Sequence, residues 1–367
     1  MNKSSPTHFH TLTGQKLPLP LFFPDATRAI VKSLDSLDIK NTKTPGILVN
    51  TYHLVDQPGK STIKSFGGIR NYMNWDGACI SDSGGFQIMS IAKSSNIKNP
   101  VTDRGVVIKN TKKGRKIFTP KDSIDLQIVL KTDLIVVLDD FTPPNASLSE
   151  AKVTVERTLK WAKVCKDQYN SRFKNLPLGQ RPYLIGVVQG GFFQKLRIEC
   201  TKRLVDIGFD GLGFGGWPVK DDHSFDYDSA QSIKKHTPKD YLLYGLGIGK
   251  PHEIKNLVRQ GWHIFDCVLP SRDARHKRLY TFNANSIDSI DLSTDKFYSY
   301  FTPDKDIYYK DKRPVSLACD CPLCQNYSRA YLCHLFKIGD FTAGRLATIH
   351  NLRFYSLLME KLQCQIN

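Results

Sequence analysis

The sequence predicts an α/β protein built as a (β/α)8 barrel, and the first observation behind this prediction is a set of short apolar runs. Eight runs rich in branched apolar residues recur along the 367-residue chain, and most are separated by stretches with helical periodicity. Continuous rather than alternating hydrophobicity is typical of strands buried on both faces, as in a parallel sheet. Eight such strands with intervening helices predict a closed barrel. The runs are residues 19–23, 46–49, 78–81, 134–138, 183–188, 211–214, 241–246 and 264–267, and the clearest helical stretches are residues 148–168, 192–208 and 252–260.

The ends of these runs are the second observation. A polar residue or a glycine lies at the end of seven of the eight runs or directly after it. In a (β/α)8 barrel the C-terminal ends of the strands carry the active site. We therefore expect these residues to line one cleft: Asn50, Asp82, Asp139, Gln189, Gly215, Gly216, Gly247 and Asp266.

Two segments interrupt the alternation of strands and helices, and they define the expected domain organisation. Residues 1–270 are expected to form the barrel, with a basic hairpin inserted near residues 91–119. Residues 271–341 are expected to form a subdomain inserted before the last helix. Residues 342–367 are then the last barrel helix and the C-terminus.

A cluster of cysteines in the second segment predicts a metal site. Cys319, Cys321 and Cys324 fall within six residues, and His350 follows on a helix-like stretch. Three thiolates and one imidazole suit a closed tetrahedral zinc site. His334 also lies downstream and competes as the fourth ligand, but a residue on the following helix would join two elements. We expect one structural zinc ion per chain, because four protein ligands leave no position for a substrate.

The charge balance predicts a polyanionic partner. The chain has 52 Lys and Arg residues against 35 Asp and Glu residues, a formal net charge of +17. Such a surface fits RNA, DNA or anionic lipid, and nucleic acid is favoured because no polybasic amphipathic helix stands out. No apolar run approaches the ~18 residues that span a membrane, and the other cysteines are scattered singly. We therefore expect a cytoplasmic protein without a membrane partner.

The candidate chemistry rests on carboxylates at separate strand ends. Asp82 precedes a pair of glycines, and Asp266 lies on the last strand. Two carboxylates across a cleft can cleave a glycosidic bond, one as nucleophile and one as acid/base. Asp139 beside Gln189 could read a purine edge, and Phe86 could stack on the base.

Six stretches of the chain, in the same order, resemble the tRNA-guanine transglycosylases (queuine tRNA-ribosyltransferases), and the resemblance covers almost the whole length. Members of this family exchange guanine at the anticodon wobble position of tRNA for a 7-deazaguanine base. The resemblance implies a homodimer, and it implies tRNA, guanine and the incoming 7-deazaguanine as partners. The matching stretches are residues 50–54, 82–87, 186–191, 245–249, 265–270 and the Cys319, Cys321, Cys324 and His350 set.

The resemblance also implies a role for each matching residue. Asp266 would be the nucleophile that attacks C1′ of the ribose, and Asp82 the general acid/base, oriented by Asn50. Phe86 and Leu246 would sandwich the base. The base edge would be bound by Asp139, Gln189, the backbone of Gly215 and Gly216, and Gly247, and the flanking nucleotides by Arg272, Arg275, Lys277 and Arg278.

The chain departs from the family at the base pocket and at the first strand. Trp217 and Lys220 replace small residues where the 7-substituent is accommodated, and Phe141 replaces a smaller residue. These side chains favour a small base, preQ1 or preQ0, over queuine. Residues 24–28, which read Pro-Asp-Ala-Thr-Arg, are also unlike the usual small residues.

Two other functions stay open from the sequence. Relatives insert 7-deazaguanines into DNA, and the basic charge fits either nucleic acid. A non-catalytic tRNA-binding subunit of a heterodimer is disfavoured because both Asp82 and Asp266 are present. The chain also ends soon after the expected last helix, without the C-terminal RNA-binding extension of archaeal relatives. We therefore expect the anticodon loop, rather than the D-arm, to be the site of action.

Overall fold

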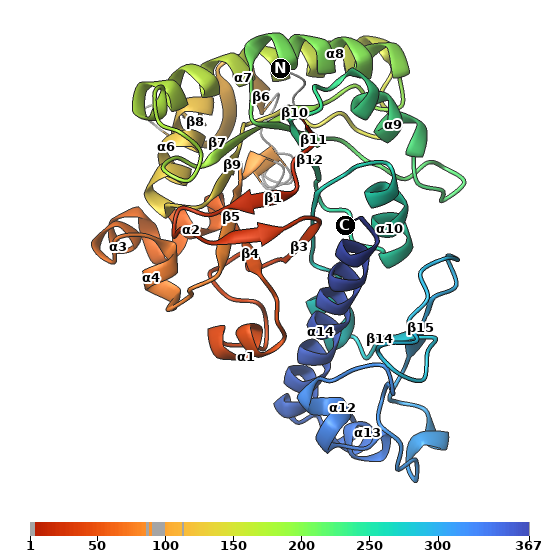
Figure 1. The fold of residues 1–367 in the computed structure, drawn as a ribbon. Helices are drawn as coiled ribbons and strands as arrows, with labels where there is room; N and C mark the ends of the chain where they lie inside the picture. Colours follow the sequence, from red (N-terminus) through yellow and green to blue (C-terminus); the bar gives the residue numbers. More distant parts are fainter. Residues whose placement is uncertain (1–3, 86–87, 90–99, 112–113, 367) are drawn as a thin grey trace.

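A parallel β-barrel forms the centre of the protein in the computed structural model (Figure 1). The structure describes residues 4–85, 88–89, 100–111 and 114–366. Eight strands pair in the order β3-β13-β12-β11-β10-β9-β5-β4, and every printed pair within this sheet is parallel. The strands are β3 (Leu21–Pro24), β4 (Gly46–Asn50), β5 (Ala78–Asp82), β9 (Leu134–Val136), β10 (Tyr183–Val188), β11 (Gly211–Phe214), β12 (Leu242–Gly245) and β13 (Ile264–Cys267). The predicted (β/α)8 barrel is confirmed.

The ring closes between the first and second barrel strands. A parallel bridge joins Asp25, just after β3, to Leu48 of β4. The amide of Ala26 donates to the Leu48 carbonyl at 2.6 Å, and the amide of Asn50 donates to the Thr27 carbonyl at 3.3 Å. Backbone groups therefore hold the two ends of the sheet together.

Three of the predicted strands match the observed strands at both ends. The runs at 183–188, 211–214 and 264–267 coincide with β10, β11 and β13. The first strand begins two residues later than the predicted run, at Leu21, whose amide donates to the His263 carbonyl at 2.9 Å. Residues Leu19 and Pro20 precede that ladder.

Helices follow most strands and cover the outside of the barrel (Figure 1). Two of them start at capping boxes, Thr119 with Asp122 and Ser147 with Glu150, in which each side chain binds the other residue's backbone amide. The helices are α1 (Ser36–Asn41), α2 (Thr51–Leu54), α3 (Lys60–Ser65), α4 (Ile69–Met73), α6 (Pro120–Leu130), α7 (Leu148–Phe173), α8 (Gln194–Ile207), α9 (Tyr227–His236), α10 (Pro251–Arg259) and α11 (Leu269–Arg275), with a π-helical segment at Val55–Gly59 between α2 and α3.

An N-terminal hairpin packs against the strand-start end of the barrel. Strands β1 (His8–His10) and β2 (Lys16–Pro18) pair antiparallel. The Phe9 ring is fully buried, stacks on Tyr183 at 4.9 Å and meets the edge of Phe23 at 6.1 Å. Because Tyr183 is the first residue of β10, this hairpin covers one end of the barrel and leaves the carboxyl ends at the other.

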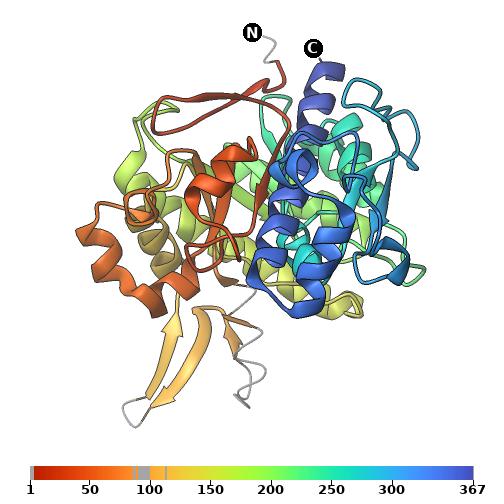
Figure 2. The same cartoon turned by 90° about the horizontal axis from the view of Figure 1, so that it is seen from below.

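A second insertion stands out from the body of the protein (Figure 2). It is a three-stranded antiparallel sheet made of β6 (Val101–Thr102), β7 (Gly105–Thr111) and β8 (Gly114–Phe118). A hairpin was expected near residues 91–119, and β7 and β8 pair within that range. Its basic residues 112 and 113, and residues 91–99, lie outside the described part of the chain.

The C-terminal part of the chain is a small subdomain joined to the barrel by one long helix. It contains the antiparallel pair β14 (Leu279–Phe282) and β15 (Tyr298–Phe301), a short 3-10 helix at Asp306–Tyr308, and helices α12 (Pro322–Asn326) and α13 (Arg329–Ile338). Helix α14 (Phe341–Ile366) runs from α12 and α13 up to the barrel (Figure 1). The boundary expected between residues 270 and 271 lies inside α11.

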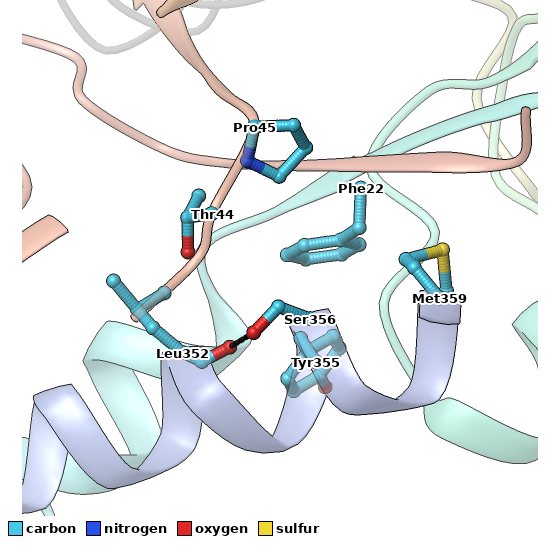
Figure 3. A pocket seen from close by; sticks show the side chains of 7 residues that line it. All are labelled: Phe22, Thr44, Pro45, Leu352, Tyr355, Ser356 and Met359. Atoms are coloured by element: carbon cyan, nitrogen blue, oxygen red, sulfur yellow. Dashed lines mark hydrogen bonds between the residues drawn. The ribbon is translucent and has the colours of Figure 1, made fainter. Parts of the chain in front are cut away.

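Helix α14 is fixed to the barrel by hydrogen bonds that its buried face makes to backbone carbonyls. The Tyr355 hydroxyl donates to the Gly249 carbonyl, and the Ser356 hydroxyl donates to the Thr42 carbonyl, both at 2.6 Å. Figure 3 shows the small pocket that remains between this helix and the start of β4, where the Phe22 ring lies beside Tyr355 and Met359. The pocket is a gap in the contact between helix and barrel.

The structure also bears on the expected absence of a membrane partner. Within the described ranges, none of the helices combines the length and the apolar character needed to cross a membrane.

Candidate active site

The aspartates predicted from the strand ends lie on the same end of the barrel. Asp82 is the last residue of β5, Asp266 lies in β13, and Asp139 follows β9 by three residues. All three are half-buried, so a substrate can reach them from the open end. The negative charge of Asp266 contributes to a raised pKa at Asp82, which places the two carboxylates within electrostatic reach of each other.

Asp82 is held by three donors from neighbouring segments. The Asn50 amide nitrogen donates to Oδ2 at 2.6 Å, and the backbone amides of Thr51 and Gly84 donate to Oδ1 at 3.2 and 3.1 Å. Desolvation nevertheless raises the pKa of Asp82 to about 7, although the Thr51 amide and Asn50 act to lower it. A carboxyl that titrates near neutral pH can both give and take a proton.

Asp266 has a different set of donors. The Tyr244 hydroxyl and the Gly247 amide both donate to its Oδ1, at 2.7 and 2.9 Å. Desolvation raises the pKa of Asp266 to about 6, while the Gly247 amide and Tyr244 lower it. Tyr244 was not predicted as a site residue, because its position inside a continuous apolar run gave it the pattern of a core residue.

Asp139 and Gln189 are brought together from adjacent strands. The Gln189 amide nitrogen donates to Asp139 Oδ2 at 2.6 Å, and the Gln189 carbonyl oxygen accepts from the Thr142 amide at 3.1 Å. Gln189 is fully buried, so Asp139 is the member of the pair that a ligand meets first. Desolvation raises the pKa of Asp139 to about 6.

The glycines at the end of β11 are required by close packing. A Cβ at Gly215 would lie 2.5 Å from Val187 Cγ1 and 2.6 Å from the Gln189 amide nitrogen, and Gly216 has a φ of +82°. A side chain at either position would push into the Asp139–Gln189 pair or strain the backbone.

A buried arginine that the sequence analysis missed binds the backbone on either side of Gln189 and at Gly215. Arg197 of α8 is fully buried and donates to the carbonyls of Val188, Gly191 and Gly215 at 3.0, 2.8 and 2.8 Å. Its guanidinium lies 4.3 Å from the centre of the Phe214 ring. Desolvation lowers its pKa to about 10. In the sequence it has the pattern of an ordinary charged residue on an amphipathic helix.

A third carboxylate beside Asp82 and Asp266 was also missed. Asp25 follows β3 and is half-buried, and desolvation raises its pKa. Its charge in turn contributes to the raised pKa values of both Asp82 and Asp266. The only sequence signal was the unusual stretch at residues 24–28, since the first apolar run stops just before it.

The predicted metal ligands converge in the subdomain. One sulfur atom from each of Cys319, Cys321 and Cys324 and one nitrogen of His350 all lie within 4.8 Å of one another. The Nδ1 of His350 is 3.5 Å from the Cys321 sulfur and 3.3 Å from the Cys324 sulfur. This group could hold a metal ion, and His334, the competing ligand, is exposed on α13 instead.

The second nitrogen of His350 supports a metal-binding role. Nε2 donates to the Tyr280 carbonyl at 2.7 Å, which leaves Nδ1 as the lone-pair nitrogen that faces the sulfurs. Metal-binding histidines commonly donate their other N–H to a carbonyl or carboxylate, which fixes the tautomer. The donor set therefore fits a zinc ion.

Comparison with known proteins identifies the family. A family model described as Queuine tRNA-ribosyltransferase matches residues 7–367. The chain is 37% identical over 345 residues to a queuine tRNA-ribosyltransferase of Thermoanaerobacter pseudethanolicus, which covers 94% of this chain and 85% of the relative. The chain belongs to the queuine tRNA-ribosyltransferase family.

Two further members of this family show similar agreement. A queuine tRNA-ribosyltransferase of Hydrogenovibrio crunogenus is 36% identical over 351 residues, with 94% of this chain and 86% of the relative covered. One from Acinetobacter baumannii is 34% identical over 354 residues, with 96% and 88% covered. The predicted family resemblance and enzyme class, a pentosyltransferase that modifies tRNA, are confirmed.

The loop that contains Trp217 and Lys220, where the sequence analysis expects a departure from the family, holds an ion-pair cluster. Lys220 directs its ammonium group toward Asp228 at 3.3 Å and Asp226 at 3.8 Å. Trp217 is 48% exposed, and Phe141 is half-buried against the core.

Leu246, one of the two residues expected to sandwich the base, is half-buried and lies over Gly213. A Cβ added at Gly213 would come within 2.9 Å of the Leu246 Cδ1 atom. Phe86, its expected partner around the base, lies outside the described residues.

The predicted RNA-binding residues follow the Asp266 strand directly. Arg272 and Arg275 lie on α11, and Lys277 and Arg278 in the turn after it. Arg272 and Arg278 are exposed, and the Arg278 guanidinium lies 5.2 Å from the centre of the Tyr300 ring. Their ion pairs with Asp273 are long, at 3.8 and 3.9 Å. These cations are therefore accessible to phosphate groups.

Replacing Asp82 by asparagine should change how thermal stability depends on pH. Because the folded protein raises the pKa of this carboxyl to about 7, the native state binds its proton more tightly than the unfolded chain does. Its contribution to stability is fully present below about pH 4 and is lost as pH rises through about 7. The melting temperature of Asp82→Asn should therefore fall less than that of the wild type over this range.

The matched control is Asp167→Asn, which changes an exposed carboxyl on α7. Its melting temperature should follow the wild-type pH profile. Equal profiles for both variants would show that the stability of the fold does not depend on the ionisation of Asp82.

Proposed function

We propose that this protein exchanges guanine at the wobble position of the tRNA anticodon for a 7-deazaguanine base by double displacement through a covalent aspartyl–ribose intermediate. The observation that carries this proposal is the pair of carboxylates with different donors at the open end of the barrel. Asp266 is bound at one oxygen by Tyr244 and Gly247. Asp82 is bound at both oxygens and has a pKa of about 7.

In the first step Asp266 is the nucleophile. Its Oδ2 forms a bond to C1′ of the ribose while the bond between C1′ and N9 of guanine breaks. The proton of Asp82 moves to the departing guanine, which leaves as the neutral base. The Tyr244 hydroxyl and the Gly247 amide keep Oδ1 occupied, which directs the other oxygen to attack.

In the second step the reaction runs in reverse with a different base. Asp82 takes the N9 proton of the incoming 7-deazaguanine, whose nitrogen attacks C1′, and Asp266 leaves as the carboxylate. Two inversions at C1′ retain the configuration of the glycosidic bond. A group with a pKa near the working pH is suited to transfer a proton in both directions.

The base would be bound on the far side of the cleft from Asp266. Asp139 would accept hydrogen bonds from the base edge, and the Gln189 amide nitrogen holds Asp139 in place by donating to its Oδ2. The Gly216 amide would contribute a donor, whereas the Gly215 amide already donates to the Val188 carbonyl at 3.0 Å, and the exposed Gly247 borders the pocket. The ring would lie between Leu246 and Phe86.

The tRNA would be held by the cations beside the Asp266 strand. Arg272, Arg275, Lys277 and Arg278 extend from the end of β13, next to the attacked ribose. The net charge of +17 supports long-range attraction of the polyanion.

A zinc ion would be held by Cys319, Cys321, Cys324 and His350. With four protein ligands the ion supplies structural rather than catalytic chemistry. It would join α12 to α14, since the cysteines lie at and beside the first helix and the histidine on the second.

A homodimer through the subdomain is supported by exposed apolar side chains near α13. Tyr327 and Tyr331 stack with ring centres 5.3 Å apart, and Ile338 and Phe341 are 59% and 96% exposed. Light scattering on the purified chain measures its mass, and a monomer at micromolar concentration would exclude this assembly.

The exchange reaction is tested with radiolabelled guanine. Wild-type protein should incorporate label into tRNA and not into duplex DNA, whereas Asp266→Ala should abolish incorporation and leave tRNA binding nearly unchanged. The covalent complex on a denaturing gel should also disappear. Asp82→Asn should lose turnover because it cannot carry the proton, and Asp167→Asn should behave as the wild type.

Three results would contradict this proposal. Full activity of Asp266→Ala would remove the nucleophile assignment. Incorporation into DNA alone would make the protein a DNA transglycosylase. tRNA binding by the wild type without any incorporation would favour a non-catalytic subunit.

Metal analysis of the purified chain should find one zinc ion per chain. Cys321→Ser should lose the ion and melt at a lower temperature, because a structural zinc site contributes free energy of folding directly. The control is Cys364→Ser, which changes an exposed free cysteine. An absence of metal together with a melting temperature unaffected by a chelator would contradict the zinc assignment.

The incoming base should be preQ1 or preQ0 rather than queuine. Phe141 and Trp217 take up room beside the pocket, and overpacking typically costs ~1–3 kcal/mol. At ~1.4 kcal/mol per decade this predicts a roughly tenfold to hundredfold lower kcat/KM for queuine. Trp217→Ala should reduce the preference, and the control Phe66→Ala, another exposed aromatic residue, should not. A queuine value equal to the other two in the wild type would refute the pocket assignment.

A further inference from the structure

The third carboxylate of the cleft, Asp25, points into the barrel with the two carboxylates of the reaction. Phe23 is opposite Asp266 in the register of β3 and β13, and Asp25 lies two residues further along the same strand direction. Side chains two residues apart on a strand face the same side, and paired residues on parallel neighbours do as well. Asp25 therefore shares the inner face with Asp266, one layer nearer the open end.

The side chain of Asp25 is not needed for the closure of the barrel. The bridge to Leu48 and the hydrogen bond from the Ala26 amide to the Leu48 carbonyl are made by backbone groups, which any residue supplies. The carboxylate itself accepts from the Thr27 hydroxyl at 2.5 Å and from the Thr27 amide. A third acid next to two others is unfavourable, because like charges repel in a partly desolvated site.

A metal ion does not explain the extra acid. Among the residues that the structure describes, the grouping of at least three potential ligand atoms within 4.8 Å is the one made by the three cysteines and His350. The three carboxylates of the cleft do not form such a group, so we take them to line a space for a larger ligand.

The order of strands in the barrel indicates which part of the substrate Asp25 would face. Asp139, Gln189 and Gly216 follow β9, β10 and β11, three consecutive strands of the sheet. In the closed ring of eight strands, β3 lies four positions from β10, directly across the barrel. Asp266 is on β13, the neighbour of β3. A nucleoside with its base toward Gln189 and C1′ at Asp266 therefore extends its sugar toward Asp25.

We propose that the Asp25 carboxylate accepts a hydrogen bond from the 2′-hydroxyl of the ribose under attack and thereby selects RNA over DNA. This inference rests on the proposed function. The 2′-carbon is bonded directly to C1′, so its hydroxyl stays beside whatever attacks C1′. In retaining glycosidases, hydrogen bonds to the sugar 2-hydroxyl strengthen in the oxocarbenium-like transition state. Asp25 is thus a specificity-determining residue that contributes mainly to kcat.

The test compares two substrates that differ by one oxygen atom. One is an anticodon stem-loop RNA with guanosine at the target position, and the other is the same RNA with a single 2′-deoxyguanosine there. The wild type should exchange the first with a kcat/KM about tenfold to a hundredfold higher, the range for a hydrogen bond to a charged group. In Asp25→Ala this ratio should fall close to one, because kcat/KM for the ribose substrate decreases.

Two further variants and one binding measurement separate recognition from folding. Asp25→Asn keeps a neutral acceptor and should retain part of the preference. Asp56→Ala removes an exposed acid from the nearby Val55–Gly59 segment and should keep the wild-type ratio. The affinity for the stem-loop should change little in any variant. Because each ratio is internal to one variant, a general loss of folded protein cancels.

An unchanged ratio in Asp25→Ala and Asp25→Asn would overturn the inference, as would a wild type that exchanges guanine but shows no preference for the ribose substrate. Both results leave the transglycosylase proposal intact. A wild type that exchanges guanine in neither RNA overturns the proposed function, and the inference with it.

Discussion

Closure of the parallel sheet is the constraint on which the other features of the structure depend. Strand β3 pairs with β13 on one side and bridges to β4 on the other, so eight strands share one axis and one direction. Because all of them point the same way, residues that are far apart in the chain meet at one rim. Asp25, Asp82 and Asp266 become neighbours only through this closure, and the N-terminal hairpin packs against the opposite end of the barrel.

The barrel rim that positions the carboxylates also gives each of them a different set of hydrogen-bond donors. Desolvation raises the pKa of every acid in the cleft, but each acid has its own donors. Asp82 is bound by a side-chain amide and two backbone amides, Asp266 by a phenol and one amide, and Asp139 by Gln189. These different donors support the roles proposed for the three acids: proton transfer for Asp82, attack for Asp266 and base recognition for Asp139.

Helix α14 couples the cysteine cluster to this rim. His350 meets the thiols of the subdomain. One residue along the helix, Asn351 donates to the carbonyl of Pro270, just before the predicted RNA-binding residues, and to that of Arg278, the last of them. Tyr355, one turn later, binds the Gly249 carbonyl just beyond the Leu246–Gly247 turn. A single helix thus connects the candidate metal site to the loops that flank Asp266, so the proposed zinc ion would support these loops as well as the subdomain.

The sequence by itself determined the barrel, the residues at most strand ends and the four candidate metal ligands, because continuous apolar runs, their polar endings and close Cys spacing are local signals. It did not identify Tyr244, Arg197 or Asp25. Tyr244 lay within an apolar run, Arg197 had the pattern of an ordinary helix surface, and Asp25 lay beyond the end of the first apolar run. Tertiary structure decided their roles, because the partners of a side chain depend on strand register and on which strand lies opposite, and neither quantity is encoded in local periodicity.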